Sequence, residues 1–268
     1  MDDLERLTAQ IDTWDAQKGG LLLLTDYDGT LTPFAPDPGG AWLDPAVREE
    51  LSELAVGPVS RVAFISGRDL DDLRARIAVP DAVYAGCHGL DIDGPGISFR
   101  HPEAEARRSL LEALAHTLAL KAFTVQGLRV EPKRLAVALH TRHVSPPDRR
   151  KVEWLHGQLR HGFAEDLEVL EGECVLDVLP RVAWSKGECI RRLHHALAPL
   201  LPRPLLTLYL GDERADESAF RVLAGQVVTV RVGRPDRHST ARYQLDSVHR
   251  AHRLLARLAG RVAARAAA

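Results

Sequence analysis

The sequence predicts an α/β protein with a doubly wound parallel sheet as its core and a smaller α+β module inserted into that core. Two observations lead to this fold class. Short apolar runs alternate with helical patterns toward both ends of the 268-residue chain, as they do in the strand–helix–strand units of parallel sheets. Between these regions, helical patterns alternate with pairs of strand-like segments typical of antiparallel hairpins. We therefore expect core segments at residues 1–100 and 182–268, with the α+β module at 101–181.

The first core segment begins with a helix and a strand that is buried on both faces. Leu4, Leu7, Ile11 and Trp14 recur at helical spacing. Four consecutive leucines at 21–24 lie between two glycines and a polar run, which is typical of a central strand in a parallel sheet. The pattern then predicts, in order, a helix from about Asp44 with Pro45 in its first turn, a strand at 59–65, a helix containing Leu70, Leu73 and Ile77, and a strand at 83–86.

The rest of the chain contains the inserted module and the second core segment. In the module, the patterns predict a helix at 102–120, a hairpin of strands 123–130 and 135–140 joined by a charged turn at 131–134, a helix at 147–159 and a hairpin within 167–178. In the second core segment, they predict a helix after Ser185, strands at 205–210 and 227–232, and a final helix from about Ser247.

Composition excludes several classes of protein. The net charge is -2 and charges of both signs are interspersed, so no basic field favours nucleic acid. Cys87, Cys174 and Cys189 are odd in number and form no C-x-x-C pair, which argues against a disulfide framework or a zinc site. The first residues lack a signal-peptide pattern, and no apolar run reaches the roughly 20 residues of a membrane span. We expect a soluble, cytoplasmic protein that binds neither nucleic acid nor membrane.

Polar side chains gather where the predicted strands end and helices begin. Asp26 and Asp28 follow the four-leucine strand, Ser66 follows the strand at 59–65, Lys186 begins a helix, and Asp212 and Asp216 follow the strand at 205–210. In an open parallel sheet, the carboxyl ends of the strands form the ligand-binding edge. A carboxylate can attack phosphorus only if cations offset its repulsion from the phosphate, and grouped carboxylates recruit Mg²⁺. The set predicts phosphoryl transfer.

Each of these residues also has a purely structural interpretation. The Asp26-x-Asp28 pair could form a turn, Lys186 could be a solvated helix residue, and Asp216 could cap the next helix. Ser66 precedes a glycine, which is common turn chemistry. The order of the four motifs along the chain favours the catalytic interpretation, because each motif supplies a different group that phosphoryl transfer needs.

Asp26-Tyr-Asp28-Gly-Thr30, Ser66, Lys186 and Gly211-Asp212-x-x-x-Asp216 together resemble the four motifs of the haloacid-dehalogenase-like phosphatases. Within that superfamily, the chain is similar to the trehalose-6-phosphate phosphatase family. The closer resemblance rests on residues 65–68, 85–91, 131–133, 140–142, 186–187 and 211–217, and it spans nearly the whole chain after the leading helix. It implies a Rossmann-like core and an α+β cap.

The resemblance also implies a role for each motif residue. Asp26 is expected to be the nucleophile that forms an aspartyl-phosphate, and Asp28 the acid that protonates the leaving sugar oxygen and then activates water. Ser66 and Lys186 are expected to hold the phosphoryl group. The Mg²⁺ site is expected to comprise Asp26, Asp28 through its main-chain carbonyl, Asp212 and Asp216, the last by holding Lys186 or the metal shell.

For substrate recognition, the resemblance implies hydrolysis of trehalose 6-phosphate to trehalose and phosphate, a step of trehalose biosynthesis. The expected substrate-binding residues are Ser66, Gly67, Arg68, His88, Glu131, Lys133, Arg142 and Glu171. His88 could instead satisfy buried backbone groups beside the site, and the charges of the module could form a solvated hairpin. We expect a monomer that takes a small sugar phosphate and is functionally coupled to a trehalose-6-phosphate synthase.

Two alternatives stay open at this point. The family usually has Asn where this chain has Cys87 and Glu where it has Asp177, so another sugar phosphate, such as sucrose phosphate or a glycosyl-phosphoglycerate, could be the substrate. A non-catalytic regulatory module that binds a sugar phosphate is the second alternative. The presence of all four motifs argues against it.

Overall fold

The computed structural model describes residues 2–35, 38–163, 165–223 and 225–266. The chain forms two compact units. The first unit comprises Met1–Ser66, Leu70–Ser98 and Trp184–Ala268, and the second comprises Gly67–Asp69 and Phe99–Ala183. Among the described residues, no helix is both long enough and apolar enough to cross a membrane.

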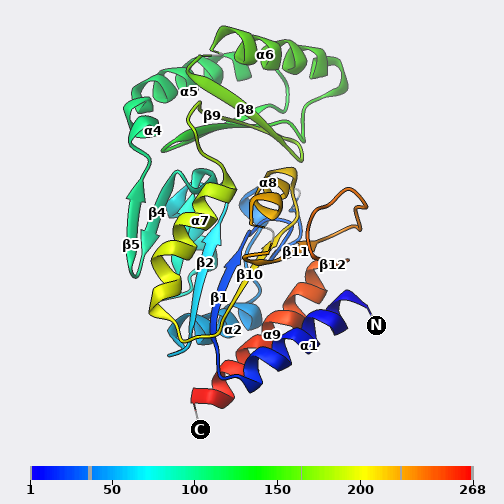
Figure 1. The fold of residues 1–268 in the computed structure, drawn as a ribbon. Coiled ribbons are helices and arrows are strands. Elements are labelled where there is room, and N and C mark those ends of the chain that lie inside the picture. Colours follow the sequence, from blue (N-terminus) through cyan, green and yellow to red (C-terminus); the bar gives the residue numbers. More distant parts are fainter. Residues whose placement is uncertain (1, 36–37, 164, 224, 267–268) are drawn as a thin grey trace. The chain divides into compact units, whose positions relative to one another are not determined.

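The first unit is built on an eight-stranded sheet with the order β12-β11-β10-β1-β2-β3-β4-β5 (Figure 1). Its strands are β1 (Gly20–Thr25), β2 (Ser60–Ile65), β3 (Val83–Gly86), β4 (Asp91–Gly94), β5 (Ile97–Arg100), β10 (Leu205–Gly211), β11 (Val228–Val232) and β12 (Tyr243–Leu245). Its helices are α1 (Asp3–Ala16), α2 (Pro45–Val56), α3 (Leu70–Ile77), α7 (Lys186–Leu197), α8 (Arg214–Val222) and α9 (Val248–Ala266). The strands from β12 to β3 run parallel, and β4 pairs antiparallel with β3. The predicted doubly wound α/β core is confirmed.

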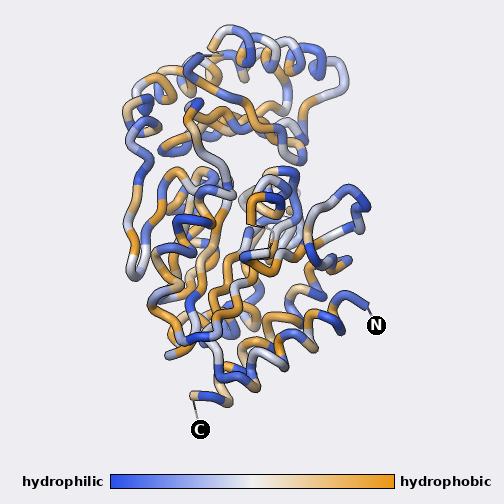
Figure 2. The backbone as a smooth tube through the Cα atoms, viewed as in Figure 1, coloured by the Kyte–Doolittle hydropathy of each residue, from blue (hydrophilic) through white to orange (hydrophobic). Residues whose placement is uncertain are grey.

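Strand β1 lies at the centre of this sheet, and all six of its residues are buried. Leu21 and Leu23 belong to the apolar cluster that β1 shares with α1, α2, α3 and α9. Because successive side chains of a strand point to opposite faces, Leu22 and Leu24 face the other side, where α7 contacts β1 and β2. In Figure 2 the sheet strands are correspondingly dominated by apolar residues. A strand covered on both faces needs an uninterrupted apolar run, which explains the four leucines.

Helix starts in the first unit are fixed by short polar side chains. Asp2 accepts a hydrogen bond from the Glu5 amide and Glu5 accepts one from the Asp2 amide, which forms a capping box on α1. Asp44 caps α2, whose first residue is Pro45. Ser185 caps α7. The cap at Ser185 places Lys186 in the first turn of α7, where the chain leaves the second unit.

The second unit pairs a four-stranded antiparallel sheet with helices on one face. The sheet order is β6-β7-β9-β8. The elements are α4 (Pro102–Ala106), α5 (Arg108–Ala122), β6 (Arg129–Lys133), β7 (Ala136–His140), α6 (Arg149–Gly162), β8 (Leu167–Gly172) and β9 (Val175–Pro180). Val137, Leu139 and Val178 pack with Leu118 of α5 and Leu155 of α6 in a separate apolar cluster. The two units therefore have independent cores.

The prediction of a strand at 123–130 and a turn at 131–134 is wrong. The chain turns through Gly127, which has φ +85° and whose added Cβ would lie 1.8 Å from the His143 carbonyl oxygen. Strand β6 starts at Arg129 and includes Glu131, Pro132 and Lys133. Proline is tolerated there because β6 is an edge strand. The charges and the proline resemble a turn in the sequence, but they belong to the exposed margin of a sheet.

Three other differences from the sequence prediction concern short elements. The predicted helix at 102–120 is two helices, α4 and α5. Strands β4 and β5, of four residues each, and the three-residue β12 were not predicted. Segments this short carry too few side chains to establish a period of 2.

The residue that follows α3 has a left-handed backbone conformation, and a substitution there can test whether this conformation is strained. Ala78 follows α3 with φ +50° and is exposed, a conformation that glycine adopts without the Cβ penalty. We expect Ala78→Gly to raise the free energy of unfolding by about 1 kcal/mol, measured by urea denaturation. The matched control is Ala75→Gly inside α3, which should lower stability by about 1 kcal/mol. Destabilisation by both substitutions would contradict the assignment of strain at Ala78.

Candidate active site

The carboxyl ends of β1, β2 and β10 lie side by side and carry the predicted motif residues. Thr25, the last residue of β1, is in register with Phe64 of β2 and Leu210 of β10. Asp26 follows directly, and its amide donates to the Leu210 carbonyl at 2.8 Å. Ser66 follows β2 and Asp212 follows β10. Parallel pairing thus gathers residues that are up to 186 positions apart at one edge of the sheet.

Lys186 lies between two carboxylates at this edge. Its Nζ is 3.1 Å from Asp26 Oδ1 and 2.9 Å from Asp216 Oδ1, and all three side chains are at most 5% exposed. Burial alone would lower the pKa of Lys186, but the carboxylates of Asp216 and Asp26 outweigh it and hold that pKa well above its usual value. The two carboxylates therefore favour the ammonium form of Lys186.

Asp216, in the first turn of α8, accepts hydrogen bonds from several groups around Lys186. Its Oδ1 accepts from Lys186 and from the Tyr209 hydroxyl, and its Oδ2 accepts from the amides of Asp212 at 3.0 Å and Glu213 at 2.9 Å. Although burial opposes it, the Lys186 ammonium and these hydrogen bonds lower the pKa of Asp216. A carboxylate has about four acceptor sites, and these four hydrogen bonds use all of them.

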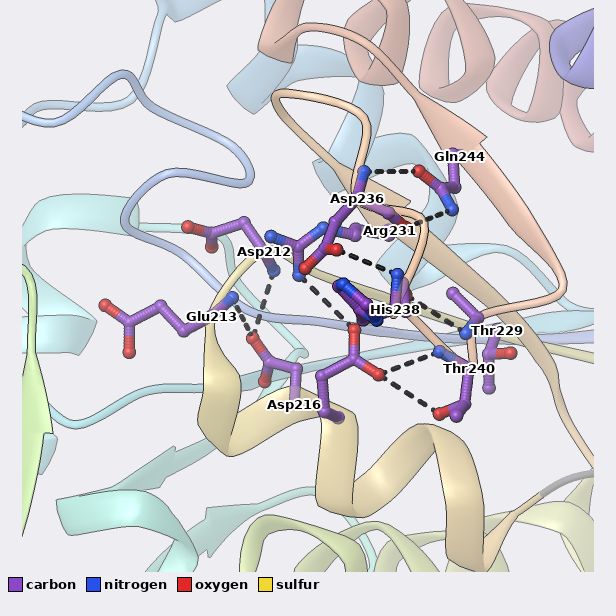
Figure 3. A network of polar contacts seen from close by, with 12 residues as sticks. Asp212, Glu213, Asp216, Thr229, Arg231, Asp236, His238, Thr240 and Gln244 are labelled. Atoms are coloured by element: carbon purple, nitrogen blue, oxygen red, sulfur yellow. Dashed lines mark hydrogen bonds and ion pairs between the residues drawn. The ribbon is translucent and has the colours of Figure 1, made fainter.

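Glu217, the next residue of α8, fixes the opposite side of the helix. Its carboxylate lies 3.3 Å from Arg231 of β11 and accepts from the Thr240 amide at 2.9 Å and the Thr240 hydroxyl at 3.1 Å (Figure 3). Arg231 is the register partner of Gly211, the residue before Asp212. The start of α8, and with it the Asp212 loop, is therefore held by Lys186 on one side and by β11 on the other.

The surroundings of Asp26 and Asp212 disfavour the ionised forms of both carboxyl groups. Burial raises the pKa of Asp26 well above its ordinary value, Lys186 opposes this rise, and the carboxylates of Asp216 and Asp212 add to it. Burial also raises the pKa of Asp212 to about 7, with Asp216 and Glu213 contributing, although Thr30 Oγ1 donates to its carboxylate at 2.8 Å. A second cation would relieve this repulsion.

The donor set fits a divalent cation with oxygen ligands. One carboxylate oxygen from each of Asp26, Asp212 and Asp216 lies within 4.8 Å of the others. Three carboxylates against one ammonium leave an excess of negative charge, and oxygen-only ligands suit Mg²⁺. Gly29 keeps this space open, because a Cβ there would lie 2.1 Å from Asp212 Oδ2. Asp28 is half-buried and is not part of the three-carboxylate group.

A left-handed turn after β3 holds the main chain of Ser66. Cys87, His88 and Gly89 have φ of 49°, 57° and 88°, which is an uncommon conformation for the first two. The turn aims the His88 amide at the Ser66 carbonyl, at 2.8 Å, while the Ser66 amide donates to the Ala85 carbonyl at 2.9 Å. The contact to Ser66 is made by the main chain of His88, and the role of the His88 side chain stays a prediction.

The second unit brings some of the predicted sugar-binding residues together. Lys133 Nζ is 2.7 Å from Asp177 Oδ1 and donates to the Gly67 carbonyl at 2.8 Å. His140 Nε2 is 2.7 Å from Glu131 Oε2. The strand register aligns Glu131, Ala138 and Asp177 in one row across β6, β7 and β9. Glu131 and Lys133 therefore share one face of the sheet with Asp177 and His140.

Two of the predicted residues lie elsewhere. Glu171 contacts helix α6, with its Oε1 3.4 Å from His156 Nε2 and 3.8 Å from Arg160. It is thus on the helix-covered face, opposite Glu131 and Lys133. Arg142 follows β7 and lies 3.4 Å from Glu173 in an exposed pair. The structure thus places Glu171 on the other face from Glu131, and Arg142 beyond the end of β7. Gly67 and Arg68 are half-buried beside Ser66 in the chain.

The fold of the chain is similar to that of the haloacid-dehalogenase-like hydrolases. The structure of such a hydrolase from Bacteroides thetaiotaomicron matches with a TM-score of 0.60 at 16% identity, over 89% of this chain and 99% of that chain. More narrowly, the chain belongs to the trehalose-phosphatase family, whose model matches residues 24–249.

Relatives of this family are similar over most of the chain. The trehalose-phosphate phosphatase of Mycobacterium tuberculosis is 34% identical over 239 residues, which is 87% of this chain and 60% of the relative. The C-terminal domain of trehalose-6-phosphate phosphatase from Candida albicans matches with a TM-score of 0.75 at 24% identity, over 92% of this chain and 94% of that domain. The chain spans from 60% to 71% of the length of the first curated relatives it matches.

The charge imbalance at the site predicts that a divalent cation stabilises the fold. At a Mg²⁺ concentration about 100 times its Kd, we expect about 2.7 kcal/mol of added stability, measured as a rise in Tm over protein in EDTA. Asp212→Asn should abolish that rise while leaving the metal-free protein at least as stable at pH 8, because it removes a like charge. Asp81→Asn, an exposed acid outside the cluster, is the control and should keep the rise. An Mg²⁺ response that survives in Asp212→Asn would contradict the assigned cation site.

Proposed function

We propose that this chain is a Mg²⁺-dependent phosphatase that hydrolyses trehalose 6-phosphate to trehalose and phosphate through an aspartyl-phosphate on Asp26. The observation that carries the proposal is the buried Asp26 carboxylate, which lies 3.1 Å from the Lys186 Nζ. Both groups lie at the sheet edge where Ser66 follows β2 and Asp212 follows β10. Membership of the trehalose-phosphatase family supports the reaction class and the substrate.

The first half of the reaction transfers the phosphoryl group to Asp26. A carboxylate oxygen of Asp26 forms a bond to phosphorus, and the bond from phosphorus to the sugar oxygen breaks. Asp28, two residues further on, gives its proton to the leaving sugar oxygen. Lys186 and the Ser66 hydroxyl orient the phosphoryl oxygens, and the buried site strengthens the attraction between the Lys186 ammonium and the phosphoryl charge.

The second half of the reaction restores the carboxylate. Asp28, now ionised, takes a proton from water, whose oxygen attacks phosphorus and releases phosphate from Asp26. A Mg²⁺ ion held by Asp26, Asp212 and the main-chain carbonyl of Asp28 would supply the additional positive charge that this exchange needs. Asp216 is assigned to hold Lys186 and the Asp212 loop, because its two oxygens already accept four hydrogen bonds.

The second unit is assigned to recognition of the sugar. Glu131 and Lys133, on the face of its sheet opposite α5 and α6, are charged hydrogen-bonding groups suited to the hydroxyls of a disaccharide. We assign this unit as the cap that the sequence predicts. The three cysteines are free thiols, which suits the cytoplasm as the proposed location. A monomer that is functionally coupled to a trehalose-6-phosphate synthase completes the proposal.

The nucleophile is tested by Asp26→Asn. This variant should lower phosphate release by at least about 1,000-fold, because the amide cannot form the acyl phosphate. Release is measured with trehalose 6-phosphate and Mg²⁺, and circular dichroism checks that the variant remains folded. Turnover near that of the parent protein would contradict the assignment of Asp26. If neither the parent protein nor the variant releases phosphate but both bind the sugar phosphate, the result would favour the alternative of a non-catalytic regulatory module.

The substrate is tested with a panel of phosphate esters. We expect the highest kcat/KM for trehalose 6-phosphate, lower values for sucrose phosphate and glucosyl-phosphoglycerate, and a low value for p-nitrophenyl phosphate, which has no sugar. The Asp26→Asn protein serves as the blank. A clear preference for another ester, with trehalose 6-phosphate near the blank, would contradict the proposed substrate and leave the phosphatase chemistry intact.

A further inference from the structure

The two faces of the sheet of the second unit differ in composition. One face is apolar and packs on α5 and α6 through Val137 and Leu139. The other face carries Glu131 and Lys133 on the edge strand β6, Asp177 on β9 and His140 at the end of β7. Strand β7 therefore lies between the charged residues of β6 and Asp177 of β9.

Two alanines on β7 allow these side chains to meet. Ala136 and Ala138 lie between β6 and β9 on this face, and both are fully buried. Since alanine fills only the space of a methyl group, a long side chain of β6 can reach over β7. Lys133 does so, with its Nζ 2.7 Å from Asp177 Oδ1. A larger residue at position 138 would separate the row formed by Glu131, Ala138 and Asp177.

His140 is the next residue of β7 on the same face, and its ring contacts Glu131. Glu131 is in register with Ala138, and His140 is in register with Arg129, so the two side chains are diagonal neighbours. His140 Nε2 lies 2.7 Å from Glu131 Oε2, with the side chains 17% and 27% exposed. The contact is thus short and partly shielded from solvent.

We propose that His140 is a positioning residue that fixes the carboxylate of Glu131 for sugar recognition. The inference rests on the proposed function, in which Glu131 accepts hydrogen bonds from sugar hydroxyls. A carboxylate offers about four acceptor sites, so one bond to His140 does not exhaust its capacity. A glutamate side chain has three rotatable bonds, and ordering it only on binding weakens affinity. His140 restricts these rotations before the substrate arrives.

The test compares His140→Ala with the conservative His140→Gln, whose amide nitrogen can still donate to Glu131. His140→Ala should raise the KM for trehalose 6-phosphate by roughly 3- to 10-fold with kcat nearly unchanged, the size expected when one side chain must be ordered on binding. His140→Gln should recover most of the parent KM. Neither variant should change kcat/KM for p-nitrophenyl phosphate by more than about twofold, because that ester has no sugar to recognise. His116→Ala, an exposed histidine of α5, is the matched control and should behave as the parent.

A double-mutant cycle with Glu131→Gln decides whether His140 acts through Glu131. If it does, His140→Ala should raise KM much less in the Glu131→Gln protein than in the parent. An equal rise in both backgrounds would overturn the inference, as would an equal loss with both substrates or an unchanged KM in His140→Ala. The proposed function is tested separately, by the preference of the parent protein for trehalose 6-phosphate within the panel of esters. Its failure would therefore be distinguishable from failure of this inference.

Discussion

The buried ion pairs of Lys186 are the interaction on which the first unit depends. An ammonium group taken out of water is costly unless carboxylates compensate it, and here Asp26 and Asp216 flank it from the ends of two different elements. Asp216 in turn accepts from the Tyr209 hydroxyl of β10 and from two amides of the Asp212 loop. One charge therefore links the end of β1, the start of α7, the centre of β10 and the start of α8.

The two carboxylates that flank Lys186, Asp26 and Asp216, have different electrostatic surroundings. Asp216 is satisfied by its hydrogen bonds, whereas Asp26 is buried beside like charges that penalise its ionised form. Two carboxylates that share one lysine thus have pKa values shifted in opposite directions, because their surroundings differ. A further cation near Asp26 would favour its ionised form.

Much of this organisation could be predicted from the sequence, because it is encoded in local patterns. These patterns determine only the structure of nearby residues. Examples are the four leucines of β1, the capping residues Asp44 and Ser185, and the motif aspartates. Contacts across the fold could not be predicted in that way. No local sequence pattern indicates that the Tyr209 hydroxyl donates a hydrogen bond to Asp216. Nor does any indicate that Glu171 contacts α6 while Glu131 lies on the other face of the sheet. Strand β6 was misplaced because Pro132 and its charged neighbours are typical of turns as well as of edge strands.

Pro132 has a consequence for how the sheet of the second unit behaves toward other protein molecules. An edge strand normally presents amide and carbonyl groups on which a further strand can add, and such addition leads to aggregation. Proline has no N–H to donate to a further strand. This margin is thereby a poor template for strand addition. A residue that looks like a break in the pattern thus protects this edge of the sheet from pairing with a second chain.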